Sequence, residues 1–284
     1  MQNRTHRIFS VLLAVTLAGN VLASRNPLAK RLVLDETQKP HYLGRTAKPS
    51  SEKIIVATGN RIVLLDRASK TILWESSGLR GAFCVDALPE GGFLVGEGKS
   101  IVHLDKDGRM VSRASINFGL TTDVKSLSGG RMLVSDGSAG TVAEMDWQGN
   151  ITWSVSGLHW PSEAQRLPNG NTLVADGTAR LKEFDSNGKL IHVIGLQRWA
   201  ASVQRVDDGT LVGERDAVEL LDIEGHAIWS QPKSGRVTGV QRLPSGEYLI
   251  SEPDAKRITI LDDQGNVTWE ATGLGLPSRA ISLR

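Results

Sequence analysis

The sequence predicts an all-β fold, a six-bladed β-propeller built of four-stranded antiparallel blades, and three observations support it. A stretch of 37 to 40 residues recurs along the chain after residue 50. Each copy divides into four short runs rich in Val, Ile, Leu and Phe, separated by turn residues. The last copy is split between the two ends of the repeat region. A fixed period of this length is the mark of a repeat architecture, so each copy is one structural unit.

The copy from Pro161 to Trp199 shows how one blade is built. Its runs SEAQRL, NTLVAD, RLKEFD and KLIHVI alternate between apolar and polar residues, as the strands of an antiparallel meander do. Asn169 and Gly170 form a tight turn after the first strand, and Asp185 to Gly188 suits a type I turn after the third. Because neighbouring strands run in opposite directions, both tight turns lie on one face. The connections from strand two to strand three, and from blade to blade, lie on the other.

The spacing of the copies predicts how the ring closes. The copies begin near Ala82, Thr121, Pro161, Ala200, Val237 and Pro277. The sixth copy has only a first strand, LPSRAISLR, at the C-terminus, and KIIVAT, RIVLLD and TILWES near residues 53–76 supply its other three strands. A blade made of one C-terminal and three N-terminal strands closes the ring and leaves no open radial edge.

Two residue types recur at fixed places and are predicted to be structural. An Asp ends the third strand of every copy, as Asp66, Asp105, Asp146, Asp185, Asp222 and Asp262. The fourth strand carries a Trp in four copies, Trp74, Trp153, Trp229 and Trp269, with Ser112 and His192 at the matching places in the other two. A large aromatic ring there can wedge between neighbouring blades and bury roughly 150–250 Å².

The chain before the repeats predicts an exported protein of three parts. Residues 1–23 resemble a secretory signal peptide, because Arg4 and Arg7 precede an apolar run that ends in small residues. That run is too short to span a bilayer as a helix. Residues 24–50 carry three prolines and little periodicity, which predicts an extended arm or linker, and residues 51–284 form the propeller. The expected location is therefore the periplasm or the cell exterior.

The charge balance argues against a nucleic-acid-binding protein, and the cysteine count excludes an intrachain disulfide. Without Arg4 and Arg7 the 33 basic residues fall to 31, which equals the number of acidic residues. A balanced charge without a basic face argues against a nucleic-acid-binding protein. Cys84 is the single cysteine, so no intrachain disulfide can form. Its place at the start of an inner strand predicts a buried, unreactive thiol.

Candidate ligand-binding residues gather where the blade-to-blade connections meet the first strands. They are Arg80, Trp160, Glu163, Arg198, Trp199, Arg236 and Arg279. Guanidinium groups pair with carboxylate, sulfate or phosphate, and a Trp ring can flank an aromatic or sugar ring, so one hypothesis is a site for an anionic ligand. The alternative is that the arginines pair with acids near the ends of the second strands, Glu97, Asp136, Asp176, Glu214 and Glu252.

Two further hypotheses concern chemistry at the same mouth of the channel. His159 is the histidine expected on that face, and as a nucleophile or general base it would act with Arg80, Arg198 or Glu163 beside it. Asp123 and Glu163 begin inner strands of adjacent blades, which makes them candidate ligands for a calcium ion. No other cofactor is predicted, because the sequence has no metal-type Cys/His spacing and no phosphate-binding loop.

The repeats resemble three groups of known propellers. LPNGNTLVADGTARLKEFDSNGK, residues 167–189, resembles NHL-type repeats and the repeats of bacterial arylsulfotransferases. The pattern D-x-x-G-x-x-x-W, as in Asp146–Trp153, is similar to the tryptophan motif of PQQ-like quinoprotein repeats. The arylsulfotransferase resemblance implies a histidine nucleophile with basic partners, here His159 with Arg80, Arg198 or Arg279. The NHL-type resemblance implies partner binding without catalysis.

Together these features favour an exported binding module that engages a ligand or a protein partner at the channel mouth. The expected partners are a protein, a glycan or a small anionic ligand, with no nucleic acid and no membrane span. The alternative is an enzyme that acts on an anionic or aromatic ester, arylsulfotransferase-like or lactonase-like, through His159. A third hypothesis is a purely structural component of the cell envelope. Propellers host many unrelated activities, so the fold does not decide among these hypotheses.

Overall fold

The computed structural model describes residues 42–44, 52–69, 71–116 and 118–283. All of the described residues belong to the unit Thr37–Arg284. The predicted signal peptide and most of the predicted arm therefore lie outside the described residues. Among those residues, no helix is long and apolar enough to cross a membrane.

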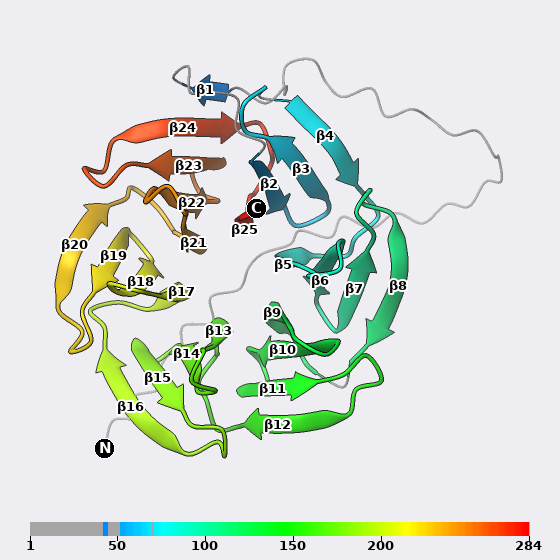
Figure 1. The fold of residues 1–284 in the computed structure, drawn as a ribbon, viewed down its shortest axis with the longest axis vertical. Helices are drawn as coiled ribbons and strands as arrows, with labels where there is room; N and C mark the ends of the chain where they lie inside the picture. Colours follow the sequence, from blue (N-terminus) through cyan, green and yellow to red (C-terminus); the bar gives the residue numbers. More distant parts are fainter. Residues whose placement is uncertain (1–41, 45–51, 70, 117, 284) are drawn as a thin grey trace, which may run out of the picture. The chain divides into compact units, whose positions relative to one another are not determined.

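The described residues form six antiparallel sheets, which are the six predicted blades (Figure 1). Blade 1 consists of β5 (Ala82–Ala87), β6 (Phe93–Glu97), β7 (Ser100–Leu104) and β8 (Met110–Ser115). Blade 2 consists of β9 (Thr121–Leu127), β10 (Arg131–Asp136), β11 (Thr141–Met145) and β12 (Ile151–Val155). Blade 3 consists of β13 (Glu163–Arg166), β14 (Thr172–Asp176), β15 (Arg180–Phe184) and β16 (Leu190–Gly195).

The second half of the ring repeats the same order of strands. Blade 4 consists of β17 (Ala200–Val206), β18 (Gly209–Glu214), β19 (Ala217–Leu221) and β20 (Ala227–Pro232). Blade 5 consists of β21 (Gly239–Arg242), β22 (Tyr248–Glu252), β23 (Arg257–Leu261) and β24 (Val267–Thr272). Blade 6 consists of β25 (Arg279–Leu283) with β2 (Lys53–Ala57), β3 (Ile62–Asp66) and β4 (Thr71–Ser76).

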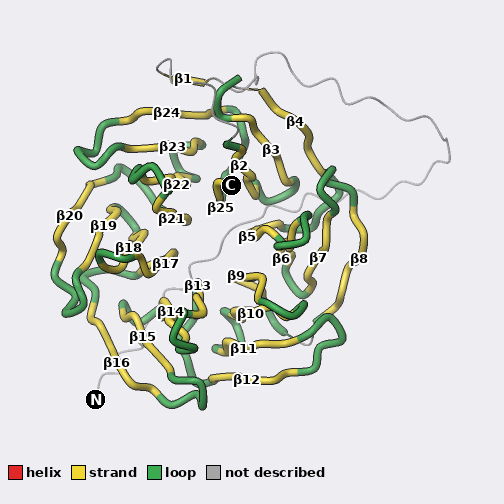
Figure 2. Tube along the Cα trace, in the orientation of Figure 1, coloured by secondary structure: helices red, strands yellow, loops and turns green. Residues whose placement is uncertain are grey.

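Blade 6 closes the ring as the sequence predicts. β25 pairs antiparallel with β2, from Lys53 opposite Leu283 to Ala57 opposite Arg279. The innermost strands β5, β9, β13, β17, β21 and β25 each contact the next one around the ring, and β25 contacts β5. Figure 2 shows these six strands gathered around the centre of the ring. One C-terminal strand thus seals three N-terminal ones, and the prediction is confirmed.

The hydrophobic core lies between the blades, which explains why second strands are apolar on both faces. In β2, Ile54 and Val56 pack against blade 5, while Ile55 and Ala57 pack against blade 1. Successive side chains of a strand point to opposite faces, so a strand between two neighbouring blades is buried on both faces and is mostly apolar. All five residues of β14, Thr172–Asp176, are buried for the same reason.

The recurring Asp and Trp residues have the structural roles that their spacing predicts. Each Asp after strand three accepts hydrogen bonds from the backbone of its own turn; the Asp146 carboxylate, for example, binds the N–H groups of Gln148 and Asn150 at 2.9 Å. Trp229 stacks on Tyr248 of the next blade, with 4.4 Å between ring centroids. Its indole N–H also donates to the Asp263 carbonyl oxygen at 2.9 Å. These contacts fasten neighbouring blades together.

A short strand outside the predicted propeller region joins the outer edge of blade 5. β1 (Tyr42–Gly44) pairs antiparallel with β24, with Tyr42 opposite Ala271 and Gly44 opposite Trp269. Blade 5 is therefore a five-stranded sheet, whereas the other blades have four strands. The sequence predicts only an extended arm here, because three residues carry no detectable periodicity.

Candidate functional site in the central channel

The arginines predicted to form an anion site lie in different environments in the structure. Arg80 is exposed, and its backbone N–H donates to the Glu97 carboxylate. Arg198 pairs with Glu214 at 3.3 Å and with Asp216 at 2.9 Å. Arg236 forms a two-pronged pair with Asp254, at 2.6 and 3.0 Å. The geometry of Arg198 and Arg236 is thus that of the alternative hypothesis, in which the arginines pair with nearby acids.

The remaining predicted residues of that face, Trp160, Trp199 and His159, differ in their exposure. Trp160 is 43% exposed, and its backbone has a positive φ of 49°. Trp199 is partly buried, while the side chain of His159 is exposed. The His159 backbone N–H donates to Asp176 at 3.0 Å. The role of His159 as a nucleophile or base stays a prediction, as do the ligand-binding roles of the two tryptophans.

The other two predicted residues, Glu163 and Arg279, meet inside the channel. They belong to blades 3 and 6, which lie opposite each other in the ring (Figure 1). Arg279 Nη1 lies 2.7 Å from Glu163 Oε2, and both side chains are about 5% exposed. Lys125, which the sequence analysis overlooks, lies 2.6 Å from Glu163 Oε1 and 3.6 Å from Asp123 Oδ1. The Arg279 side chain therefore crosses the channel and joins opposite blades.

Hydrogen bonds complete this ionic network. Ser202 Oγ donates to Glu163 Oε2 at 2.6 Å and lies 2.8 Å from Arg279 Nη1. The backbone N–H of Val203 donates to the same carboxylate oxygen at 2.9 Å. Buried charges are tolerated when they are paired and hydrogen-bonded, and Glu163 meets both conditions. Because this network spans the channel from blade 3 to blade 6, we call it the floor of the channel.

The network shifts the pKa values of its two acids in opposite directions. Burial raises the pKa of Glu163, but the positive charges of Arg279 and Lys125 and their hydrogen bonds outweigh it and lower the pKa to about 2. Burial raises the pKa of Asp123 to about 6, with Lys125 opposing the rise and the negative charge of Glu163 adding to it. Burial alone would lower the pKa of Lys125, but the negative charges of Asp123 and Glu163 raise it by more. The ammonium group therefore stays charged.

The predicted calcium ligands are occupied by cationic side chains. Lys125 lies between Asp123 and Glu163, and Arg279 lies 2.7 Å from Glu163 and 3.8 Å from Asp123. A calcium ion needs six to eight oxygen ligands and would have to displace both cations. The structure places these two carboxylates in an ion-pair network, and their role as calcium ligands stays a prediction.

The network belongs to one of two layers of side chains that project into the channel from the first strands. We call the first the buried layer; its members are Cys84, Asp123, Glu163, Ser202, Gly239 and Arg279. Each of them pairs with a residue of the second strand of its own blade. That partner is the residue immediately before the recurring acid of the blade, or before Thr58 in blade 6; the acids are Glu97, Asp136, Asp176, Glu214 and Glu252. All six are buried. Burial raises the pKa of Cys84 to about 12, which fits the predicted unreactive thiol.

The second layer lies two residues further along each first strand, and we call it the amide layer. Its members are Asp86, Lys125, Gln165, Gln204, Gln241 and Ile281, all of them partly exposed. Residues two apart on a strand share a face, so both layers point into the channel. Three glutamines each accept a hydrogen bond from the backbone of the next blade: Gln165 from Arg205 N–H at 2.6 Å, Gln204 from Arg242 N–H at 2.7 Å, and Gln241 from Ser282 N–H at 2.7 Å.

The amide layer surrounds a cavity of about 620 Å³. Glu163, Lys125 and Arg279 line its inner end, and Gly91 and Gly92 of the turn between β5 and β6 line its rim. The cavity therefore opens on the face that carries the tight turns, opposite to the face where the sequence analysis places the ligand. The signal for it in the sequence is the polar residue near the middle of five successive first strands, at spacings of 39, 40, 39 and 37 residues.

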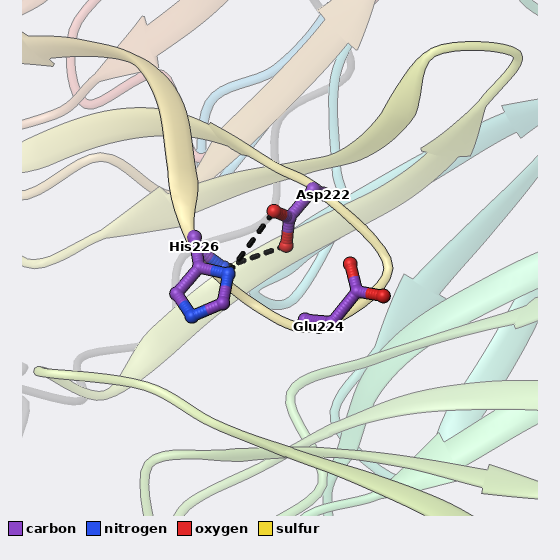
Figure 3. A group of neighbouring side chains, drawn as sticks. All are labelled: Asp222, Glu224 and His226. Carbon is purple, nitrogen blue, oxygen red and sulfur yellow. Dashed lines mark hydrogen bonds and ion pairs between the residues drawn. The ribbon is translucent and has the colours of Figure 1, made fainter.

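A separate group of metal-ligating residue types lies on the turn between β19 and β20. Asp222, Glu224 and His226 each offer a ligand atom, and these atoms lie within 4.8 Å of one another (Figure 3). His226 Nδ1 is 3.1 Å from Asp222 Oδ2, and the His226 backbone N–H donates to Asp222 Oδ1 at 2.8 Å. The same turn in blades 1, 2, 3 and 5 has the corresponding backbone hydrogen bond to its Asp, so the approach of Asp222 to His226 is explained by the turn itself.

Comparisons with known proteins agree with the fold. No protein-family model matches the sequence, and no curated protein matches it. The structure is similar to a protein of unknown function from Bacteroides caccae, with a TM-score of 0.69, 20% identity, and coverage of 83% of this chain and 100% of that one. It is also similar to the WD40 β-propeller domain of Doa1, with a TM-score of 0.61, 15% identity, and coverage of 80% and 81%. At these identities the similarity establishes a β-propeller and nothing about ligand or activity.

Proposed function

We propose that this protein is an exported binding module that receives a small ligand in the channel cavity. The observation that carries the proposal is the cavity itself: about 620 Å³, open on the tight-turn face and floored by the Glu163–Arg279 ion pair. Cavities of 300–1,000 Å³ with a few placed polar groups are typical of ligand sites. Export rests on the resemblance of residues 1–23 to a signal peptide.

The side chains of the cavity favour binding over catalysis. Lys125 is held as an ammonium ion by two acids and so lacks the lone pair that a nucleophile or base needs. Ser282 Oγ donates its proton to Glu52 at 2.6 Å, and Glu52 is in turn paired with Arg67. Ser202 likewise donates to Glu163, which is paired with Arg279, so the carboxylate beside each of these hydroxyl groups is already committed to an arginine. The NHL-type resemblance of the repeats, which implies binding without catalysis, points the same way.

The proposal is tested by measuring ligand binding to the full chain and to a variant with a filled cavity. A thermal-shift screen with sugars, carboxylic acids, amines and phosphate esters should give at least one stabilising ligand. A ligand at one hundred times its dissociation constant adds about 2.7 kcal/mol, or roughly 5 to 10 °C at this size. Ile281→Trp places an indole in the cavity and should abolish that shift.

Ile228→Trp is the matched control, because Ile228 is 55% exposed on the outer strand β20. This variant should bind as the unaltered chain does. Equal binding by Ile281→Trp and the unaltered chain would place the ligand elsewhere on the propeller. A panel in which no compound stabilises the chain would contradict a small-molecule function altogether.

A further inference from the structure

The orientation of the three channel glutamines is fixed by the backbone of the next blade. A backbone N–H can only donate, so the atom that receives it at 2.6–2.7 Å must be the amide oxygen of Gln165, Gln204 or Gln241. The opposite end of each amide is then an NH2 group. All three glutamines line the cavity, and within the described residues their NH2 groups have no hydrogen-bond partner. Blades 3, 4 and 5 thus present three neighbouring donors.

The blades on either side of this arc offer different chemistry. Lys125 of blade 2 extends the arc with an ammonium group, although its charge is already matched by Glu163 and Asp123. Asp86 of blade 1 accepts the Ser126 N–H at 2.7 Å and has no ion-pair partner among the described residues. Ile281 of blade 6 is apolar. A ligand in the cavity therefore meets donors on one side, an acceptor beside them and an apolar wall.

From this geometry we propose that the cavity binds an uncharged, hydroxyl-rich ligand of the sugar or polyol class, a proposal that rests on the ligand-binding function above. A hydroxyl group accepts a hydrogen bond from an amide and donates one to a carboxylate, so one ligand type satisfies both sides. The C–H faces of a sugar ring fit against Val203, Val240 and Ile281, which line the same cavity. The glutamine, aspartate and lysine groups stand at fixed positions, so their hydrogen bonds would select ligands by the positions of the hydroxyl groups.

The charges at the inner end of the cavity disfavour both kinds of ion, whereas Lys53 and Lys106, which also line the cavity, are exposed. An anion near the inner end would approach Glu163 and Asp86, while the nearby cations Lys125 and Arg279 are already paired with acids. A cation would approach those same two cations. A charge moved out of water needs an uncommitted partner. The inner end of the cavity offers an anion none, and it offers a cation only Asp86, which lies within the influence of the positive charge of Lys125. An uncharged ligand avoids this cost because its hydroxyl groups need only hydrogen bonds.

The experiment compares neutral sugars and a polyol with charged sugar derivatives. Isothermal titration of the full chain with D-glucose, D-galactose, D-mannose, myo-inositol and maltose should find at least one that binds. The charged relatives D-glucuronate and D-glucosamine should bind at least tenfold more weakly than the neutral ligand. Gln204→Glu keeps an oxygen for the Arg242 N–H but replaces the NH2 donor with an oxygen, so it should weaken neutral-ligand binding at least tenfold. Gln148→Glu, an exposed change outside the channel, should not.

The outcomes separate this proposal from the function on which it rests. If glucuronate or glucosamine binds better and Ile281→Trp abolishes that binding, the cavity is a ligand site but the ligand class is wrong. If a neutral sugar binds equally well to Gln204→Glu, the arc of amides is not the recognition element. If nothing binds, both proposals fail. Should Gln204→Glu not fold by circular dichroism, Gln241→Glu tests the same donor arc in blade 5.

Discussion

The buried layer and the amide layer lie two residues apart on the same six strands, yet their polar groups have different partners. In both layers, side chains accept hydrogen bonds from the backbone of the next blade: Ser202 from Val240 N–H at 3.0 Å, and Gln204 from Arg242 N–H at 2.7 Å. The buried layer directs most of its remaining polar groups to one another and to Lys125, through the contacts among Glu163, Arg279 and Ser202 and the ion pairs of Lys125. The amide layer leaves its NH2 groups open to a cavity. A closed layer stabilises the ring, whereas an open layer can bind.

This difference predicts that the largest loss of stability follows from a change in the buried layer. Arg279→Met keeps most of the side chain's length but removes the charge that pairs with Glu163 and Asp123. Breaking a buried ion pair by removing one partner costs about 3–5 kcal/mol. Urea unfolding should show this loss in the free energy of unfolding, whereas Arg61→Met, at a more exposed pair with Glu75, should cost about 0–1 kcal/mol. Similar losses in the two variants would mean that the floor of the channel is not a stabilising element.

The pH dependence of stability tests the buried layer in a second way. Because the pKa of Asp123 in the folded chain is raised to about 6, the folded chain holds this proton more tightly than the unfolded chain does. Asp123 therefore makes the free energy of unfolding fall as the pH rises from about 4 through 6. Glu163 has the opposite effect at lower pH, since its pKa is lowered to about 2 and its contribution is lost as the pH falls from about 4.5 toward that value.

Asp123→Asn isolates the first of these effects, because an amide cannot ionise. Relative to the unaltered chain, the variant should gain stability steadily between pH 4 and pH 7, as measured by urea unfolding at each unit of pH. Asp107→Asn, a change on an exposed turn of blade 1, should show no such trend. A difference between Asp123→Asn and the unaltered chain that stays constant over this range would show that Asp123 ionises normally in the fold.

In the amide layer, stability and binding should separate. Gln204→Leu removes the acceptor of the partly buried Arg242 N–H and should cost up to about 1–3 kcal/mol, the cost of an unsatisfied group. Gln204→Glu retains an acceptor and should cost less, even though it is the variant expected to lose the ligand. Urea unfolding gives the first quantity and titration the second. Equal destabilisation by the two variants would mean that the backbone hydrogen bond is not what Gln204 contributes to the fold.

The fold could be predicted from the sequence because its determinants are local and repeated. The Asp of each third turn, the Asn-Gly pair at Asn169 and the alternating strands act within a few residues, and repetition makes them visible. The site could be predicted only in part. Glu163 and Arg279 were found as single candidates, but their contact joins blades on opposite sides of the ring, and no local pattern reports it. Gln165, Gln204 and Gln241 were not predicted, because the candidate residues came from loops and from the starts of strands, whereas these glutamines lie further along their strands.

The smallest effects are expected on the opposite face, where the sequence analysis places the ligand. Arg236 is half-exposed and paired with Asp254, so Arg236→Ala should change the free energy of unfolding by no more than about 1 kcal/mol. His159 is exposed, and His159→Ala should change stability by less than about 0.5 kcal/mol. Because the cavity opens on the tight-turn face, neither change should alter the affinity for a ligand that Ile281→Trp excludes. If either variant lost that ligand, the blade-to-blade face would be the binding face after all, and loss through His159→Ala would favour the enzymatic alternative.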